Sequence, residues 1–115
     1  GNSRYIEAEL ISPNGVAGTV RMGDAELNLP GREAAPGPVK VDVQSESLRT
    51  ATAASAAPAL EGRVDKAAYV GTHMEYTVTT SVGELFVVDR VVTRPAPAGT
   101  PVWVSFEDHG VTIVP

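Results

Sequence analysis

The sequence predicts an all-β fold of about ten short strands. Val recurs throughout the 115-residue chain, whereas there are only two Phe and one Trp. Eleven Gly and nine Pro interrupt the chain every few residues, which is typical of short strands joined by turns. Between these turns, apolar and polar residues alternate with the period of half-buried strands. This pattern indicates a barrel or a sandwich rather than a fold of alternating strands and helices.

The first half contains four predicted strands. The first strand alternates Ile6, Ala8 and Leu10 with polar neighbours, and a turn is expected at 12–15, where the Asn-Gly pair at 14–15 supplies the left-handed backbone that tight hairpins need. Gly23-Asp24 marks the second turn, and Pro30-Gly31 ends the third strand. A loop rich in Pro and Gly covers 33–38 before a strictly alternating Val-Lys-Val-Asp-Val segment. The four strands are expected at 4–11, 16–22, 25–29 and 39–43.

An Ala-rich segment separates the two halves. Residues 50–58 have small side chains and end at Pro58, so they bury little surface and make a poor helix. We therefore expect a first lobe at 1–50, a linker or crossover at 51–58, and a second lobe at 59–115. Gly71-Thr72 breaks the second lobe and Gly83-Glu84 is its predicted hairpin turn. The strands of this lobe are expected at 61–70, 74–82, 85–92, 102–106 and 111–114.

The two halves also match each other. Residues 6–10 (Ile-Glu-Ala-Glu-Leu) correspond in kind to 60–64 (Leu-Glu-Gly-Arg-Val). Further along, 38–43 corresponds to 101–106, and each segment begins with Pro followed by alternating Val. The spacing leaves about nine additional residues in the second half, which we place around 67–76. The sequence therefore predicts an internal duplication.

Composition and charge exclude several classes of function. The formal net charge is −5 and the nine basic residues are scattered, so the chain lacks the basic patch that nucleic-acid binding requires. There is no Cys, which excludes disulfides and thiolate metal sites. No apolar stretch reaches the length of a membrane span, and no signal peptide is visible. Since the sequence opens with Gly1 directly before a predicted strand, we expect it to be part of a longer protein.

Motifs that carry catalysis are missing from the sequence. Lys40 and Lys66 are the only lysines, and neither lies in a phosphate-binding loop. The sequence contains no G-x-S-x-G or H-E-x-x-H motif. A zinc site would need His73 and His109 to converge with carboxylates such as Glu75 and Asp108, and two histidines in surface turns are the simpler interpretation.

Three segments of the second half resemble the type 2 TOBE domain, which follows the nucleotide-binding domain in the ATP-binding subunits of bacterial ABC importers. These segments are 60–64 (Leu-Glu-Gly-Arg-Val), 69–78 (Tyr-Val-Gly-Thr-His-Met-Glu-Tyr-Thr-Val) and 83–88 (Gly-Glu-Leu-Phe-Val-Val). The closing segments 101–106 and 111–115 resemble that family's last strands, and the first half resembles its preceding lobe, from Gly1-Asn2 onward. The family usually has Arg-Pro-Glu at the end of that lobe, where this chain has Gln44-Ser45-Glu46.

The resemblance implies two small OB-like barrel lobes of short antiparallel strands. It also implies a non-catalytic regulatory and assembly domain of an importer of polyamines, ferric iron or phosphonates. The implied partners are a nucleotide-binding domain, a second copy of the subunit and a permease, on the cytoplasmic side of the inner membrane. ATP and Mg²⁺ would be bound outside this chain, which itself needs no cofactor.

We expect the contact residues to be Gly71, Thr72, His73, Glu75 and Trp103. Gly71-Thr72 forms either a simple turn or a contact loop. Trp103 lies between Val102 and Val104 in a predicted strand, so its side chain points away from theirs. It therefore faces either a neighbouring domain or one end of the barrel. An alternative function is binding of an oxyanion or the transported solute, with the turn at 71–73 supplying donors. An OB-fold nucleic-acid binder would need a basic groove with stacking aromatic residues, which the composition does not favour.

Overall fold

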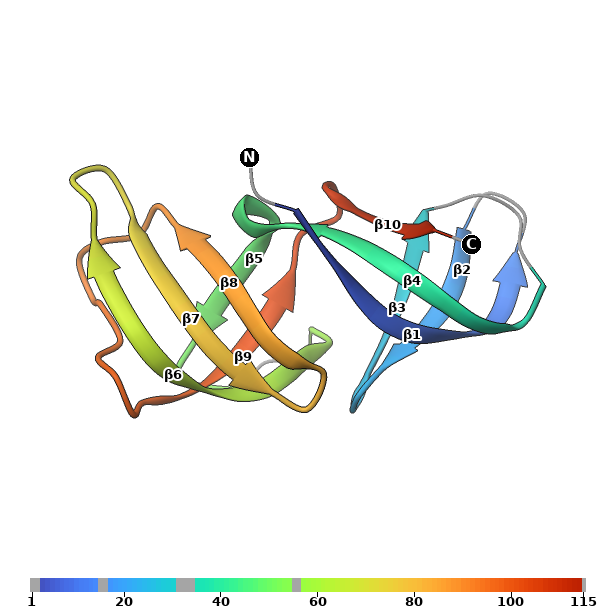
Figure 1. The fold of residues 1–115 in the computed structure, drawn as a ribbon, viewed down its shortest axis with the longest axis horizontal. Coiled ribbons are helices and arrows are strands. Elements are labelled where there is room, and N and C mark those ends of the chain that lie inside the picture. Colours follow the sequence, from blue (N-terminus) through green and yellow to red (C-terminus); the bar gives the residue numbers. More distant parts are fainter. Residues whose placement is uncertain (1–2, 15–16, 31–34, 55–56, 115) are drawn as a thin grey trace.

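Two five-stranded antiparallel sheets make up the computed structural model, which describes residues 3–14, 17–30, 35–54 and 57–114. Each sheet forms one lobe, and the lobes lie side by side along the longest axis of the molecule (Figure 1). The elements are β1 (Ser3–Asn14), β2 (Ala17–Met22), β3 (Ala25–Pro30), β4 (Gly37–Gln44), the 3-10 helix η1 (Ser45–Ser47), β5 (Leu48–Ala51), β6 (Ala59–Tyr69), β7 (Met74–Thr80), β8 (Gly83–Asp89), β9 (Pro101–Phe106) and β10 (Val111–Val114).

The two sheets have the same strand order. The first is β10-β4-β1-β2-β3 and the second is β5-β9-β6-β7-β8. Each sheet curls until its edge strands approach each other, β10 near β3 and β5 near β8. Inward-facing Val and Leu fill both curled sheets and form one continuous core. The predicted fold class, an all-β chain of two OB-like barrel lobes, is confirmed.

Strand pairing matches between the lobes residue by residue. In the first sheet Ile6 pairs with Val41, and in the second Leu60 pairs with Val104. These are the same correspondences that the sequence comparison of the halves produced. All four side chains are buried, so the alternation seen in the sequence does mark the core-facing positions. The equivalent registers support the predicted duplication.

The additional residues of the second lobe fall in two places rather than one. In the first lobe Leu10 pairs with Val20, ten positions later. In the second lobe the corresponding residues are Val64 and Val78, which pair although they lie fourteen positions apart. Four of the nine additional residues therefore lie in the β6–β7 hairpin, within the predicted region. The other five lie between β7 and β9. The sequence comparison placed all nine around 67–76, because it matched no segment between 64 and 101 that could have separated the two insertions.

The lobes exchange their fifth strands. The chain leaves β4 of the first sheet, passes through η1 and enters the second sheet as β5, whereas after β9 it crosses back and enters the first sheet as β10. The two crossovers run past each other and are joined by backbone hydrogen bonds. Gln44 N donates to Gly110 O at 2.9 Å, and Glu107 N donates to Ser47 O at 2.8 Å.

This exchange departs from the expected division of the chain at 51–58. Residues 48–51 belong to the second sheet and residues 111–114 belong to the first. A continuous stretch of sequence cannot reveal such an exchange, because β5 is four residues long and shows its hydrophobic contribution mainly through buried Leu48. The β7–β8 turn also lies at Ser81-Val82, two residues before the predicted position.

Some predictions fall on residues outside the described ranges. They concern residue 15 of the turn at 12–15, the start of the strand at 16–22, the stop at 31, the loop at 33–34, part of the linker at 55–56, and residues 1–2 and 115 of the resemblance. Residues 12–14 of the predicted turn instead continue β1 and pair with β2. Within the described ranges, no helix has the length and apolar character needed to cross a membrane.

Candidate functional site

Four of the five predicted contact residues lie together at the β6–β7 turn. Gly71 has a φ of 94°, which favours glycine, and the N–H of Val70 donates to the carbonyl of His73 at 3.0 Å across the turn. His73 Nδ1 lies 3.1 Å from Thr72 Oγ1, and His73 Nε2 lies 3.2 Å from Glu75 Oε2. Both ring nitrogens are therefore engaged, and this small network fixes the turn that projects from the second lobe.

The order hydroxyl, imidazole, carboxylate in this turn resembles that of a nucleophile, its base and an orienting group. Such a triad also needs donors for the developing oxyanion and a pocket for the acyl group. Thr72 is exposed at the tip of the hairpin, and none of the three pockets described below contains Thr72, His73 or Glu75. The contacts account for the shape of the turn.

Trp103 lies apart from this turn. It is half-buried on the outer face of β9, between Ala51 of β5 and Glu61 of β6, while Val102 and Val104 point into the core. Glu61 precedes the end of β6 at Tyr69 by eight residues, or roughly 26 Å of extended strand. The structure therefore presents Trp103 and the turn as two separate surfaces.

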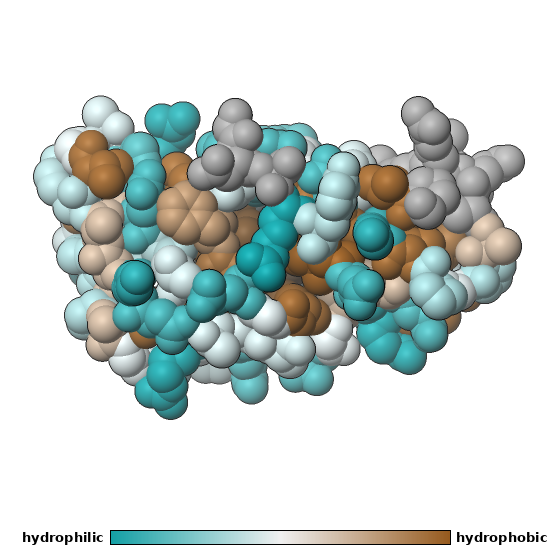
Figure 2. Space-filling view, in the orientation of Figure 1, coloured by the Kyte–Doolittle hydropathy of each residue, from teal (hydrophilic) through white to brown (hydrophobic). Residues whose placement is uncertain are grey.

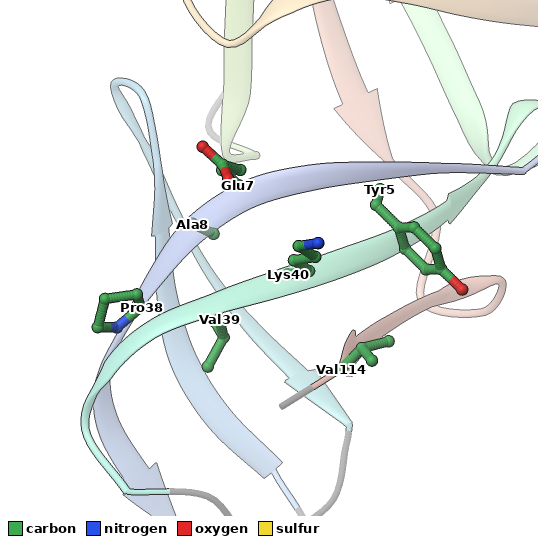
Figure 3. A pocket seen from close by; sticks show the side chains of 7 residues that line it. All are labelled: Tyr5, Glu7, Ala8, Pro38, Val39, Lys40 and Val114. Atoms are coloured by element: carbon green, nitrogen blue, oxygen red, sulfur yellow. The ribbon is translucent and has the colours of Figure 1, made fainter.

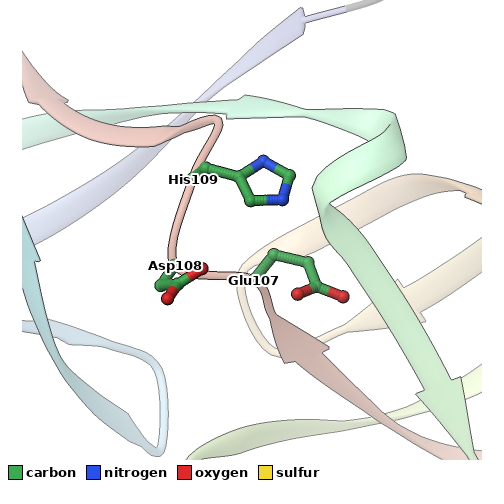
Figure 4. Close-up of side chains that lie close together, drawn as sticks. All are labelled: Glu107, Asp108 and His109. Carbon is green, nitrogen blue, oxygen red and sulfur yellow. The ribbon is translucent and has the colours of Figure 1, made fainter.

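The two histidines do not converge on one site. His109 lies in the crossover between β9 and β10, where it joins Glu107 and Asp108 (Figure 4). One ligand atom from each of these three residues lies within 4.8 Å of the other two. The Nε of Arg49 lies 3.2 Å from the Glu107 carboxylate, and this cation opposes the binding of a second one beside it. The predicted alternative of a site shared by His73, Glu75, Asp108 and His109 is therefore not formed.

Two pockets border the first lobe. One of about 520 Å³ is formed by side chains of β1, β4 and β10, with Tyr5 and Val114 near one end and Pro38 near the other (Figure 3). Another of about 450 Å³ lies between the lobes, where β1 passes the β2–β3 and β7–β8 turns. Hydrophilic and hydrophobic side chains are interspersed over both lobes on the face shown in Figure 2. This mixture is typical of an exposed face with small contact patches.

A third pocket of about 380 Å³ lies at one end of the second lobe. Its lining includes Asp89, which is only 6% exposed, and Arg94 from the segment after β8. Neither residue was among the predicted contact residues. A signal was available, because the inward positions Leu85 and Val87 of β8 lead by alternation to Asp89, where a charged residue replaces an apolar one.

The segment that departs from the resembling family is part of the crossover. Gln44 ends β4, and the two serines of η1 on either side of Glu46 are buried. The carbonyls of Glu46 and Leu48 accept hydrogen bonds from Arg49 Nη1 at 2.7 and 2.8 Å. A guanidinium thus holds this bend, supplied from the start of β5 rather than from the position of Gln44.

Comparisons with known proteins agree on one family. Residues 40–113 match the TOBE domain. Over 114 residues, or 99% of the chain, the sequence is 36% identical to the "Fe(3+) ions import ATP-binding protein FbpC" of Rhizobium etli and 32% identical to that named FbpC 1 of Rhizobium meliloti. A relative of the same name in Brucella abortus is 29% identical over the same length. The chain spans 32% of the length of each of these relatives.

Among solved structures, the fold is similar to that of the cytoplasmic molybdate-binding protein ModG in its molybdate-bound form. The TM-score is 0.76, and the match covers 96% of this chain and 94% of that one. Sequence identity is 14%, so this likeness concerns the fold.

Proposed function

Because the chain belongs to the TOBE domain family, we propose that it is an accessory domain of the ATP-binding subunit of an ABC importer, with a role in assembly and regulation. The observation that carries this proposal is the alignment of 114 residues with proteins named for Fe(3+) ion import. Of the polyamine, ferric iron and phosphonate classes that the sequence resembles, ferric iron is the cargo we propose.

In this proposal, catalysis belongs to the remainder of such a subunit. The chain has no phosphate-binding loop, so ATP and Mg²⁺ would be bound by a preceding nucleotide-binding domain. Two copies of the subunit would pair and engage a permease, which places the domain at the cytoplasmic face of the inner membrane. An accessory domain influences such a motor by binding its open and closed states with different free energies.

Two surfaces are available for these contacts. The β6–β7 turn carries Gly71, Thr72, His73 and Glu75 in a fixed geometry, and its four additional residues extend it beyond the equivalent hairpin of the first lobe. Trp103 is half-buried on a strand face and adds aromatic surface of the kind enriched at interfaces. We propose the turn and Trp103 as contacts to two different neighbours.

Exchange of domains tests this function. The matching third of the Rhizobium etli relative is replaced by this chain, and uptake of radiolabelled ferric iron is measured in cells that lack the relative. We expect uptake to be restored, because the match to this relative extends over 114 residues, or 99% of this chain. A protein from which that third is simply removed serves as the baseline.

Uptake at the baseline, from an exchanged protein that is folded and present at normal levels, would contradict the proposal. A His73→Ala variant of the exchanged protein tests the turn, with Glu84→Ala on the exposed start of β8 as its control. We expect the first variant to lower uptake and the second to leave it unchanged, with melting temperatures equal in both. Equal uptake by the two variants would remove the turn from the set of contacts.

A further inference from the structure

The pocket at the end of the second lobe contains a buried carboxylate. Asp89 is the last residue of β8 and the only charged side chain that is buried among the described residues. Its Oδ1 accepts a hydrogen bond from Val91 N at 2.9 Å, and its Oδ2 lies 3.5 Å from Thr50 Oγ1. No Lys, Arg or His of the described ranges lies within ion-pair distance of it.

A buried carboxylate without a cation is unusual. Burial of a charge costs free energy unless the charge is paired, and a carboxylate has room for about four hydrogen bonds. Asp89 receives one hydrogen bond of ordinary length and one long one. Among the described residues, the Asp89 carboxylate therefore has no cationic hydrogen-bond donor.

The same pocket carries a cation with no described partner. Arg94 lines the pocket and is exposed, and it forms no hydrogen bond or ion pair with any described residue. Arg49 lines the pocket too, but its guanidinium already contacts Glu107 and two backbone carbonyls. Two charged groups of the pocket therefore have no ion-pair partner among the described residues. They are the carboxylate of Asp89 and the guanidinium of Arg94, which do not pair with each other.

We propose that this pocket binds a small zwitterion, with its ammonium group on Asp89 and its carboxylate on Arg94. A simple anion would meet repulsion from Asp89, and a simple cation would meet repulsion from Arg94. An amino acid satisfies both groups at once, and a guanidinium binds a carboxylate well because two parallel N–H donors face its two oxygens. A volume of about 380 Å³ accommodates a molecule of this size.

The architecture of the second lobe builds this pocket. Thr50 comes from the exchanged strand β5, and Val91 and Arg94 come from the region between β7 and β9 that is five residues longer than its equivalent in the first lobe. The inference goes beyond the accessory role proposed above, and its test does not depend on ATP or on iron uptake.

Calorimetric titration of the 115-residue chain tests the inference. The probes are glycine, β-alanine and 4-aminobutanoate, which carry the same two charges at increasing separation. Propionate and propylamine carry one charge each and serve as matched probes. We expect at least one of the amino acids to bind saturably, with a Kd of about 1 mM or below, and at least tenfold more tightly than either single-charge probe.

Two variants assign the charges. Arg94→Gln is expected to weaken binding of the best amino acid about tenfold, whereas Arg90→Gln, a nearby exposed arginine outside the pocket lining, leaves it unchanged. Asp89→Asn is expected to abolish the preference for the amino acid over propionate. If that variant fails to fold, the comparison of Arg94→Gln with Arg90→Gln alone tests whether the amino acid binds in this pocket. No saturable binding, equally tight binding of a single-charge probe, or equal losses in both arginine variants would overturn the proposal.

Discussion

A chain shortened to end at Gly110 is expected to lose about 3–6 kcal/mol of its free energy of unfolding, because it lacks β10. Val111 and Ile113 are 0% and 5% exposed, and they fill the first lobe although they come from the far end of the sequence. Full burial of each contributes about 1.5–3 kcal/mol. Urea denaturation followed by circular dichroism measures the loss.

Single substitutions control for the removal of backbone. Ile113→Ala is expected to cost about 2–5 kcal/mol, as large-to-small changes in a core do. Thr112→Ala, on the exposed face of the same strand, is expected to change stability by no more than about 0.5 kcal/mol. A shortened chain that unfolds at the same urea concentration as the full chain would show that β10 adds nothing to the first lobe.

Gly110→Ala is expected to destabilise the chain by about 2–4 kcal/mol, because the added methyl group has no room between the crossovers. A Cβ at this position would lie 2.0 Å from Ser47 Oγ and 3.3 Å from Gln44 Cγ. The φ of Gly110 is also +72°, which is unfavourable for residues with a side chain. Thermal or urea unfolding measures the combined effect.

Gly99→Ala separates the two causes. Gly99 also has a positive φ, of 91°, but a Cβ there meets no atom within 4 Å. This variant should therefore lose only the conformational part, about 1–2 kcal/mol. If both variants lose the same amount, the close approach of Gly110 to Ser47 does not contribute to the junction of the lobes.

Sequence patterns predicted most of the strands because the barrels are built on simple alternation. Ile6, Val41, Leu60 and Val104 all occupy the core-facing positions that alternation assigned to them. The match between the halves also predicted the correct correspondence of the central strands, since equivalent pairings require equivalent patterns.

The strand exchange could not be predicted in the same way. A strand of four residues such as β5 has too few positions to establish a period, and alternation does not indicate which sheet a strand joins. Which lobe receives β5 or β10 depends on the path of the crossovers, which are joined by the hydrogen bonds of Gln44 with Gly110 and of Glu107 with Ser47.

The candidate sites were predicted in part. Gly71-Thr72 marked a turn, and the structure places His73 and Glu75 beside it because they follow within four residues. Trp103 was grouped with them although the folded chain holds it on another surface. The pocket of Asp89 and Arg94 was missed, since its walls come from four segments far apart in the sequence, at 49–53, 76, 89–96 and 102, and alternation does not indicate that β5 joins the second sheet.

The exchange bears on the proposed role in assembly and regulation. If the domain transmits a signal between neighbours, as proposed, its two lobes are expected to move together. Here each lobe contains a strand that continues from the other, and the crossovers are hydrogen-bonded to each other. We therefore expect the two lobes to unfold as one cooperative unit.

Cooperative unfolding of the two lobes can be measured on the backbone amide signals of Val41 and Val104 in the unmodified chain, followed through a urea titration by NMR. These two residues occupy equivalent, fully buried positions, one in each lobe. The exchange predicts that both native signals disappear at the same urea concentration. Loss of one signal while the other stays native would contradict it, because the lobes would then fold independently of the strands they share.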